Sequence, residues 1–129
     1  NELDIQDFVK FTGYVTEAEK IELLSSARLF VTTSQSDIHT TTAIEALAIG
    51  KPVVITKNSD FPEIDDYQAG ITVESTHESI FNAISELLDN ETKIQKFSDN
   101  AKRLVEEKFL LENQIDKYEN MFREVINKK

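Results

Sequence analysis

Short apolar strands alternate with helices along the first 74 residues, and this alternation constrains the fold more than any other feature of the chain. β-Branched and aromatic residues predict strands at residues 8–15, 29–33, 52–56 and 71–74. Short, apolar strands are typical of a parallel sheet that is buried on both faces. Strands that alternate with helices predict βαβ units with right-handed crossovers. We therefore expect an α/β fold with a Rossmann-like parallel sheet of about four strands flanked by helices.

Capping signals mark the helices between the strands. Thr16 and Glu19 have the Thr-x-x-Glu spacing of a capping box, which predicts a helix over residues 16–27. A second, short helix follows the turn at residues 34–39 and ends at Gly50. Residues 57–70 read as a polar loop with a turn at Pro62.

The rest of the chain departs from this alternation. A capping box at Ser75 and Glu78 predicts the start of a helix, and apolar residues at helical spacing predict two more helices after it. We therefore expect one domain over residues 1–129, with strand–helix units up to residue 74 and a helical C-terminal tail over residues 75–129.

Composition excludes several classes of function. The chain has 14 basic and 24 acidic residues, a net charge of −10, and no basic stripe for nucleic acid or an anionic membrane. It has no cysteine, so disulfides and thiolate metal sites are excluded. Its two histidines, His39 and His77, lack metal-ligand spacing, so no metal is expected. Without a signal peptide or an initial Met, the sequence reads as a piece of a larger cytoplasmic protein.

Residues 34–56, SQSDIHTTTAIEALAIGKPVVIT, hold the strongest candidate site. Asp37 lies eight positions before Glu45, in a turn that directly follows a predicted strand. Rossmann-like sheets bind ligands at the carboxyl ends of their strands, and a helix that starts there offers free N–H groups to a diphosphate. The same residues also fit structural roles, because Thr42 and Glu45 have capping-box spacing and Asp37 suits a turn cap.

This stretch resembles the nucleotide-sugar motif of retaining glycosyltransferases of the GT-B fold, the family called glycosyl transferases group 1. Gly13-Tyr14-Val15 before it and Pro62-Glu63 after it match the family in order, and the resemblance runs from Phe8 to about Tyr118. It implies the nucleotide-sugar-binding C-terminal domain of such an enzyme. The donor would be an NDP-sugar, and no cofactor or metal would be required.

The resemblance also implies roles for single residues. Backbone groups of Thr41 and Thr42 would contact the donor diphosphate, Asp37 would face the transferred sugar, and Glu45 would hold the ribose hydroxyls. The sequence departs from the family at Asp37, where a glutamate is usual. Ile38 and Thr40 replace two glycines on either side of His39, which stands at a position often aromatic in the family. A catalytic residue is not assigned, and Asp37 is a candidate contact to the donor sugar only.

Other matched positions have two interpretations each. His39 could bond the sugar or a phosphate, or could be a solvated loop histidine. Gly13, Tyr14 and Val15 would meet the nucleobase, with Tyr14 either stacking on it or covering the sheet edge. Glu63 either supports the donor site or is an ordinary surface acid. Lys51 lies past a helix end, where a role in satisfying the final carbonyls is favoured.

The resemblance predicts a hexosyltransferase that acts on a glycan or lipid acceptor through an N-terminal domain absent here, in a parent at the inner face of a membrane. The first two strands of the family's domain are also absent, so the fragment should be inactive alone. It should form either a compacted sheet or a homodimer joined through strands. The alternative is a non-catalytic, degenerate domain that serves as an interaction or oligomerisation module. A receiver-like α/β domain is disfavoured because no predicted strand ends in Asp.

Overall fold

Three parallel strands form the centre of the molecule. The computed structural model describes residues 4–36 and 40–127. Strands β1 (Phe30–Thr32), β2 (Val53–Thr56) and β3 (Gly70–Val73) pair in parallel in the order β1-β2-β3. Every residue of the central strand β2 is buried. The α/β class with a parallel sheet flanked by helices is therefore confirmed.

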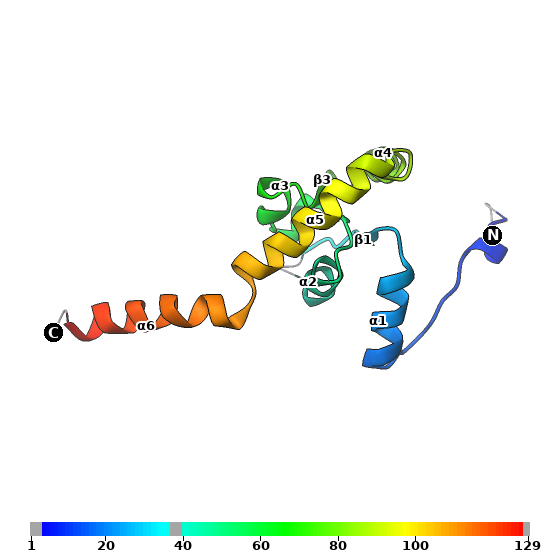
Figure 1. Ribbon diagram of the computed structural model, residues 1–129. Coiled ribbons are helices and arrows are strands. Elements are labelled where there is room, and N and C mark those ends of the chain that lie inside the picture. The colour runs from blue at the N-terminus through cyan, green and yellow to red at the C-terminus, as the bar shows by residue number, and fades with distance from the viewer. Residues whose placement is uncertain (1–3, 37–39, 128–129) are drawn as a thin grey trace.

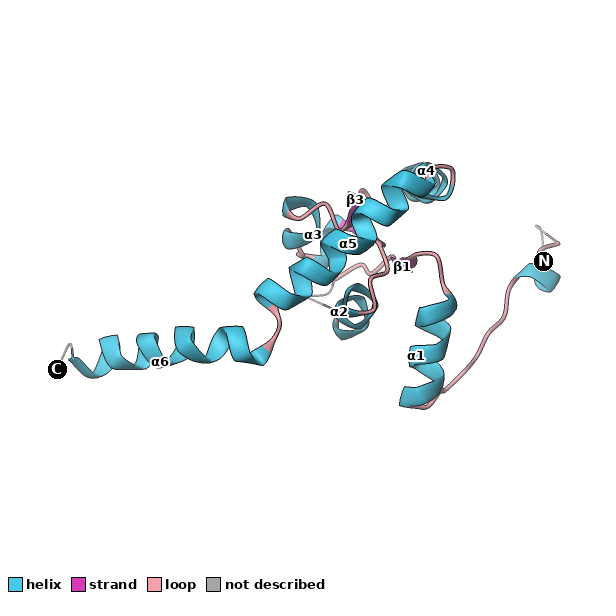
Figure 2. Ribbon diagram, in the orientation of Figure 1, coloured by secondary structure: helices cyan, strands magenta, loops and turns pink. Residues whose placement is uncertain are grey.

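Helices connect and cover the strands (Figures 1 and 2). The described part of the chain contains α1 (Glu17–Ser26), α2 (Thr41–Ala48), the short α3 (Glu63–Asp66), α4 (His77–Leu88), α5 (Glu91–Lys108) and α6 (Leu111–Asn127), with 3₁₀ turns η1 (Gln6–Phe8) and η2 (Lys57–Ser59). Helix α6 extends away from the sheet and the helices around it (Figure 1). Within residues 4–36 and 40–127, no helix combines the length and the apolar composition that crossing a membrane requires.

Alternate residues of β2 supply two separate cores. Val53 and Ile55 face one side of the sheet and pack with α2, α3 and the C-terminal half of α5. Val54 faces the other side and packs with α4 and the N-terminal part of α5. Side chains of a strand point to opposite faces in turn, so a strand that is apolar at every position must be covered on both. Helix α5 reaches both cores and fixes the sheet in place.

The predicted strand at residues 8–15 is wrong, and the sheet has three strands rather than four. This segment begins in η1 and continues as extended chain, with Phe8, Phe11 and Tyr14 exposed to 87%, 94% and 95%. Strand propensity expresses how well a residue fits a paired, half-buried surface. In the described part of the chain no strand pairs with residues 8–15, so the compacted four-stranded sheet does not form.

One predicted helix start is confirmed, one differs by a residue, and one predicted loop contains short helical turns. The capping box of Thr16 and Glu19 is confirmed, with reciprocal hydrogen bonds at the start of α1. Helix α4 is capped by Thr76, whose hydroxyl accepts from the amide of Ser79, and not by Ser75. Thr76, one residue after Ser75, is the N-cap because it directly precedes residues 77–88, the helix that carries the apolar face packed on the sheet. The predicted loop at residues 57–70 folds locally into η2 and α3.

Candidate functional site

The candidate site lies at the start of α2, just beyond the carboxyl end of β1. Thr40 is the N-cap residue, and its hydroxyl accepts a hydrogen bond from the amide of Ala43 at 3.3 Å. The interpretation of Thr42 and Glu45 as a capping box is therefore wrong. Asp37 and His39 lie outside the described residues, so the structure does not place either side chain.

The first turn of α2 carries amides that have no acceptor in the described part of the chain. Thr41 and Thr42 are the first two helical residues, and N–H groups at these positions have no acceptor within a helix. In residues 4–36 and 40–127, no group outside α2 accepts a hydrogen bond from them. Both residues are exposed. Free amides at the positive end of a helix dipole suit a phosphate group.

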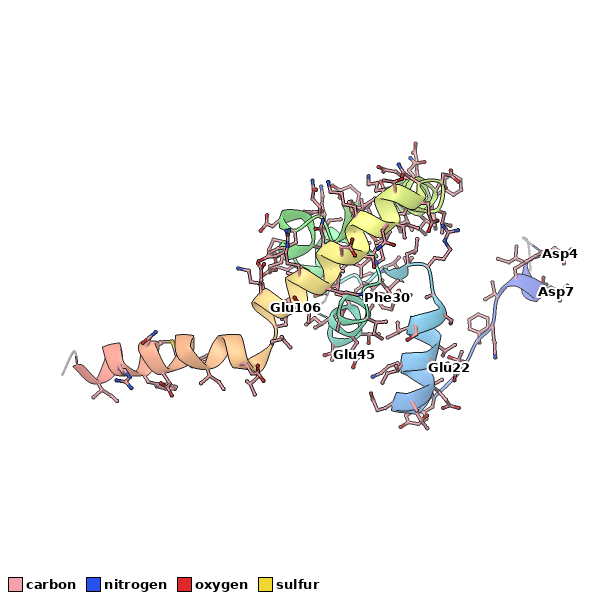
Figure 3. The ribbon with its side chains drawn as sticks, in the orientation of Figure 1. Asp4, Asp7, Glu22, Phe30, Glu45 and Glu106 are labelled. Carbon is pink, nitrogen blue, oxygen red and sulfur yellow. The ribbon has the colours of Figure 1, made fainter. Side chains whose placement is uncertain are left out.

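Glu45 lies one turn further along α2, on the side that faces α1 (Figure 3). Its Oε1 accepts a hydrogen bond from Nζ of Lys20 at 3.0 Å. Lys20 comes from α1 and also donates to Glu17 at 3.0 Å. The Lys20 and Glu45 side chains are 25% and 32% exposed, so this ion pair is partly shielded from water.

The second oxygen of the Glu45 carboxylate has no donor within residues 4–36 and 40–127. Oε2 is buried, and no group in the described part of the chain donates a hydrogen bond to it. Glu45 is also one of the residues that line a small hollow of about 220 Å³ between α1 and α2, together with Glu17, Lys20, Ile21, Leu24, Ala48 and Ile49. A buried acceptor without a donor is unfavourable, by about 1–3 kcal/mol. Glu45 thus presents an acceptor with no donor in the described part of the chain, one turn along α2 from its first amides.

Lys20 is a site residue that the sequence did not reveal. Hydrogen bonds to Glu45, and then to Glu17, raise the pKa of the Lys20 side chain above its ordinary value of 10.5. It is therefore fully charged at neutral pH. Spacing along the chain could not have identified it, because Lys20 and Glu45 are 25 positions apart and belong to different helices.

The expected nucleobase segment, Gly13 to Val15, lies just before α1. Gly13 has a φ of +63°, the left-handed conformation that favours glycine, and Val15 is half-buried just before the helix starts. Tyr14 is almost fully exposed. This segment borders a hollow of about 430 Å³ on the face of α1 that is turned away from Glu45, and the two hollows share no lining residue. The structure therefore does not bring Tyr14 and Glu45 into one cavity.

Two further candidates have structural roles or positions at helix ends. The side chain of Lys51 donates to the carbonyl of Ser25 at 2.8 Å and so satisfies the end of α1, while its backbone N–H donates to the carbonyl of Ala46 at 2.8 Å in the last turn of α2. Glu63 is the first residue of α3 and follows Pro62 at the N-cap. Among the residues that the structure places, no group of three His, Asp or Glu side chains is arranged as a metal site.

A comparison with protein families identifies the family of the chain. Residues 1–104 match the family model described as glycosyl transferases group 1. The chain belongs to this family. The resemblance to GT-B fold glycosyltransferases, made from the motif at residues 34–56, is thereby confirmed.

Curated relatives carry glycosyltransferase names. O-antigen chain mannosyltransferase C of Escherichia coli is 24% identical over 126 residues, which cover 94% of this chain and 34% of the relative. MMP alpha-(1->4)-mannosyltransferase of Mycolicibacterium hassiacum is 27% identical over 111 residues, 84% of this chain and 27% of the relative. The chain thus spans about a third or less of the curated relatives it matches.

A solved structure shares the fold. Sucrose-phosphate synthase from Thermosynechococcus elongatus superposes with a TM-score of 0.80 at 22% identity, over 99% of this chain and 33% of that one. At this identity the similarity concerns the fold, and it matches the parallel sheet and surrounding helices described above.

Proposed function

We propose that this chain is the nucleotide-sugar-binding part of a retaining glycosyltransferase that moves a hexose from an NDP-sugar to a glycan or lipid acceptor. Membership in the glycosyl transferases group 1 family supports glycosyl transfer. The mannosyltransferase names of two relatives favour a hexose as the transferred group. The observation that carries the proposal is the buried Oε2 of Glu45, which has no donor in the described part of the chain and lies one turn from the first amides of α2.

Each part of this site suits one part of the donor. The amides of Thr41 and Thr42 would donate to the diphosphate, helped by the positive end of α2. Glu45 would accept hydrogen bonds from the ribose hydroxyls, because a carboxylate has two oxygens for two vicinal donors. Asp37 and His39 are proposed as contacts to the donor sugar. Gly13, Tyr14 and Val15 are proposed to meet the nucleobase, which requires their segment to approach α2.

The proposal separates donor binding from transfer. Acceptor binding, and therefore the transfer step, would need a second domain that faces α2 across a cleft. We expect the 129-residue chain alone to bind the donor without transferring its sugar. We propose that the parent is cytoplasmic and that a charged diphosphate is neutralised by helix amides and basic residues without a metal or other cofactor.

Calorimetric titration of UDP, GDP and ADP tests the proposal. Each would be titrated into this chain, into its longer parent, and into Glu45→Ala in both forms. Losing a hydrogen bond to a charged group costs about 1.5–3 kcal/mol, so affinity should fall tenfold or more. Glu78→Ala is the matched control, since Glu78 is an exposed acid on α4 that lines neither the Glu45 hollow nor the hollow beside Tyr14. Absence of binding by the longer parent would overturn the proposal.

A non-catalytic interaction module is the second candidate. The observation that favours it is the large exposed apolar surface on two segments: residues 5–14, and α6 with Leu111, Phe122 and Ile126 exposed to between 60% and 72%. Sugar transfer assayed on the longer parent separates the two candidates. A parent that binds no nucleotide and transfers no sugar, yet retains a protein partner on these surfaces, would favour the module.

A further inference from the structure

We propose that Lys20 positions the Glu45 carboxylate, holding it by Oε1 so that Oε2 is the acceptor left for a ribose hydroxyl. The inference rests on the proposed function, because it concerns the same donor site. It adds a residue to that site which the family motif at residues 34–56 does not include. Lys20 is a positioning residue here, since it acts on the ligand through Glu45.

The geometry leaves the carboxylate one free oxygen. The Lys20 ammonium lies 3.0 Å from Oε1 of Glu45 and 3.0 Å from a carboxylate oxygen of Glu17, so it is anchored from both sides. Glu17 is 83% exposed, whereas Glu45 is 32% exposed, so the shielded contact is the one to Glu45. An ammonium has three donors and can keep both contacts while a ligand arrives.

The surroundings of Oε2 supply no alternative donor. Apart from Lys20 and Glu17, the hollow beside Glu45 is lined by apolar or alkyl groups of Ile21, Leu24, Ala48 and Ile49. A hydroxyl donor that enters this hollow and displaces the Glu45 side chain enough to reach Oε2 would satisfy an acceptor that has no donor among the described residues. A ribose offers two neighbouring hydroxyls, one for Oε2 and one for the remaining lone pair of Oε1. The hollow is too small for a whole nucleotide, so only part of the donor would enter it.

The competing explanation for the Lys20–Glu45 ion pair is that it only holds α1 against α2 and has no role in ligand binding. The chain contains a matched example of such a tie: Lys51, just past α2, donates to the carbonyl of Ser25 at the end of α1. Removing either lysine weakens the attachment of α1. Only removal of Lys20 should change how Glu45 meets a ribose, so Lys51 serves as the control.

The test compares ribonucleotides with their 2′-deoxy forms. UDP, GDP and ADP, and then dUDP, dGDP and dADP, would be titrated into the wild type, Lys20→Met, Lys20→Arg and Lys51→Met, in this chain and in its longer parent. We expect the wild type to prefer the ribonucleotide about tenfold, the value of one lost hydrogen bond to a charged group. Lys20→Met should reduce that preference to about threefold or less. Lys20→Arg should restore it, and Lys51→Met should leave it unchanged.

The outcomes separate this inference from the function on which it rests. If the wild type discriminates and Lys20→Met discriminates equally well, Lys20 is only a tie and the inference fails while the proposed function stands. An equal loss of affinity for both nucleotide forms would overturn the inference in the same way. If the wild-type parent binds no nucleotide, the proposed function fails and the inference fails with it. Ribonucleotides and their 2′-deoxy forms carry the same phosphates. Any general attraction of Lys20 for phosphate therefore cancels in the ratio of their two affinities.

Discussion

At the scale of single residues, the capping box of α1 links charge to helix formation. Glu19 accepts hydrogen bonds from the backbone N–H and the hydroxyl of Thr16, and these bonds lower the pKa of Glu19 below its ordinary value of 4.5. A carboxyl with a lowered folded-state pKa stabilises the folded state above its unfolded-state pKa. That contribution is lost as the pH falls through the lower, folded-state value.

We therefore expect α1 to lose helical population below pH 4.5, and a Glu19→Gln variant to lose less over the same range. Gln can still accept from the Thr16 amide but carries no charge to titrate. Backbone ¹³C chemical shifts of residues 17–26, followed from pH 7 to pH 3, measure this population. A wild type and a variant with the same pH dependence would contradict the linkage.

Gly70 is required by the close approach of two strands. It lies opposite Val53 in the β2–β3 register, and a Cβ added at Gly70 would lie 2.1 Å from the Val53 carbonyl oxygen. Because that atom is backbone, the strand itself would have to shift. We expect Gly70→Ala to lower the free energy of unfolding by about 1–3 kcal/mol or more, as overpacking does.

Urea unfolding measures the effect, and Gly13→Ala is the comparison. A Cβ at Gly13 meets no atom within 4 Å, and only its φ of +63° opposes the change. The resulting strain, about 1–2 kcal/mol, would fall on a segment outside the core. Equal losses of global stability for the two variants would contradict this account of Gly70.

At the scale of elements, apolar periodicity identified helices and strands better than it identified their partners. The helix at residues 16–27, the strand at residues 52–56 and the tail helices were all predicted from spacing and caps. The predicted strand at residues 8–15 is wrong because a segment forms a strand only where a neighbouring strand accepts its hydrogen bonds. A sequence pattern records that a segment is suited to pairing, whereas only the fold provides the partner.

Helix α6 also shows that an apolar pattern in the sequence does not say whether a segment is buried. Its apolar residues recur at helical spacing, yet Leu111, Phe122 and Ile126 remain 60–72% exposed because the helix extends beyond the core (Figure 1). Burial, and not the presence of apolar residues, contributes free energy to folding. We expect removal of residues 110–129 to change the free energy of unfolding by only about 0.5 kcal/mol, as surface changes do.

Urea unfolding of the shortened chain tests this expectation against the full chain. Truncation at residue 97, which cuts α5 after Phe97, is the contrasting variant, since Ala101, Leu104 and Val105 then leave the core. That variant should fail to unfold cooperatively. A large loss on removing α6 alone would mean that α6 packs more extensively than its exposure indicates.

At the scale of the whole molecule, the sheet has an open side at β1. Phe30 donates to Pro52 at 2.9 Å, so in the alternating ladder of a parallel pair the N–H and C=O of Val31 point away from β2. No strand in the described part of the chain pairs with that edge. An unpaired edge is a template for another strand, and the exposed segment at residues 8–15 is rich in strand-forming residues.

We expect two copies to associate by pairing residues 8–15 of one with β1 of the other. Sedimentation velocity at increasing concentration should show a dimer, opposed by the net charge of −10 and therefore strengthened by salt. Thr12→Pro should weaken association without unfolding the monomer, because Thr12 lies in an exposed, unpaired segment. Val31→Pro should have the same effect. A monomer at every concentration and salt level would contradict the prediction.

The sequence by itself determined the α/β class, the order of its elements and the position of the candidate site. Strand and helix periodicity, caps and the turn before α2 are local features, and local chemistry sets them. Tertiary structure alone decided the strand count, the pairing of Lys20 with Glu45 and the isolation of Oε2. These depend on which segments meet in space, and residues 25 positions apart on different helices carry no periodic mark of their contact.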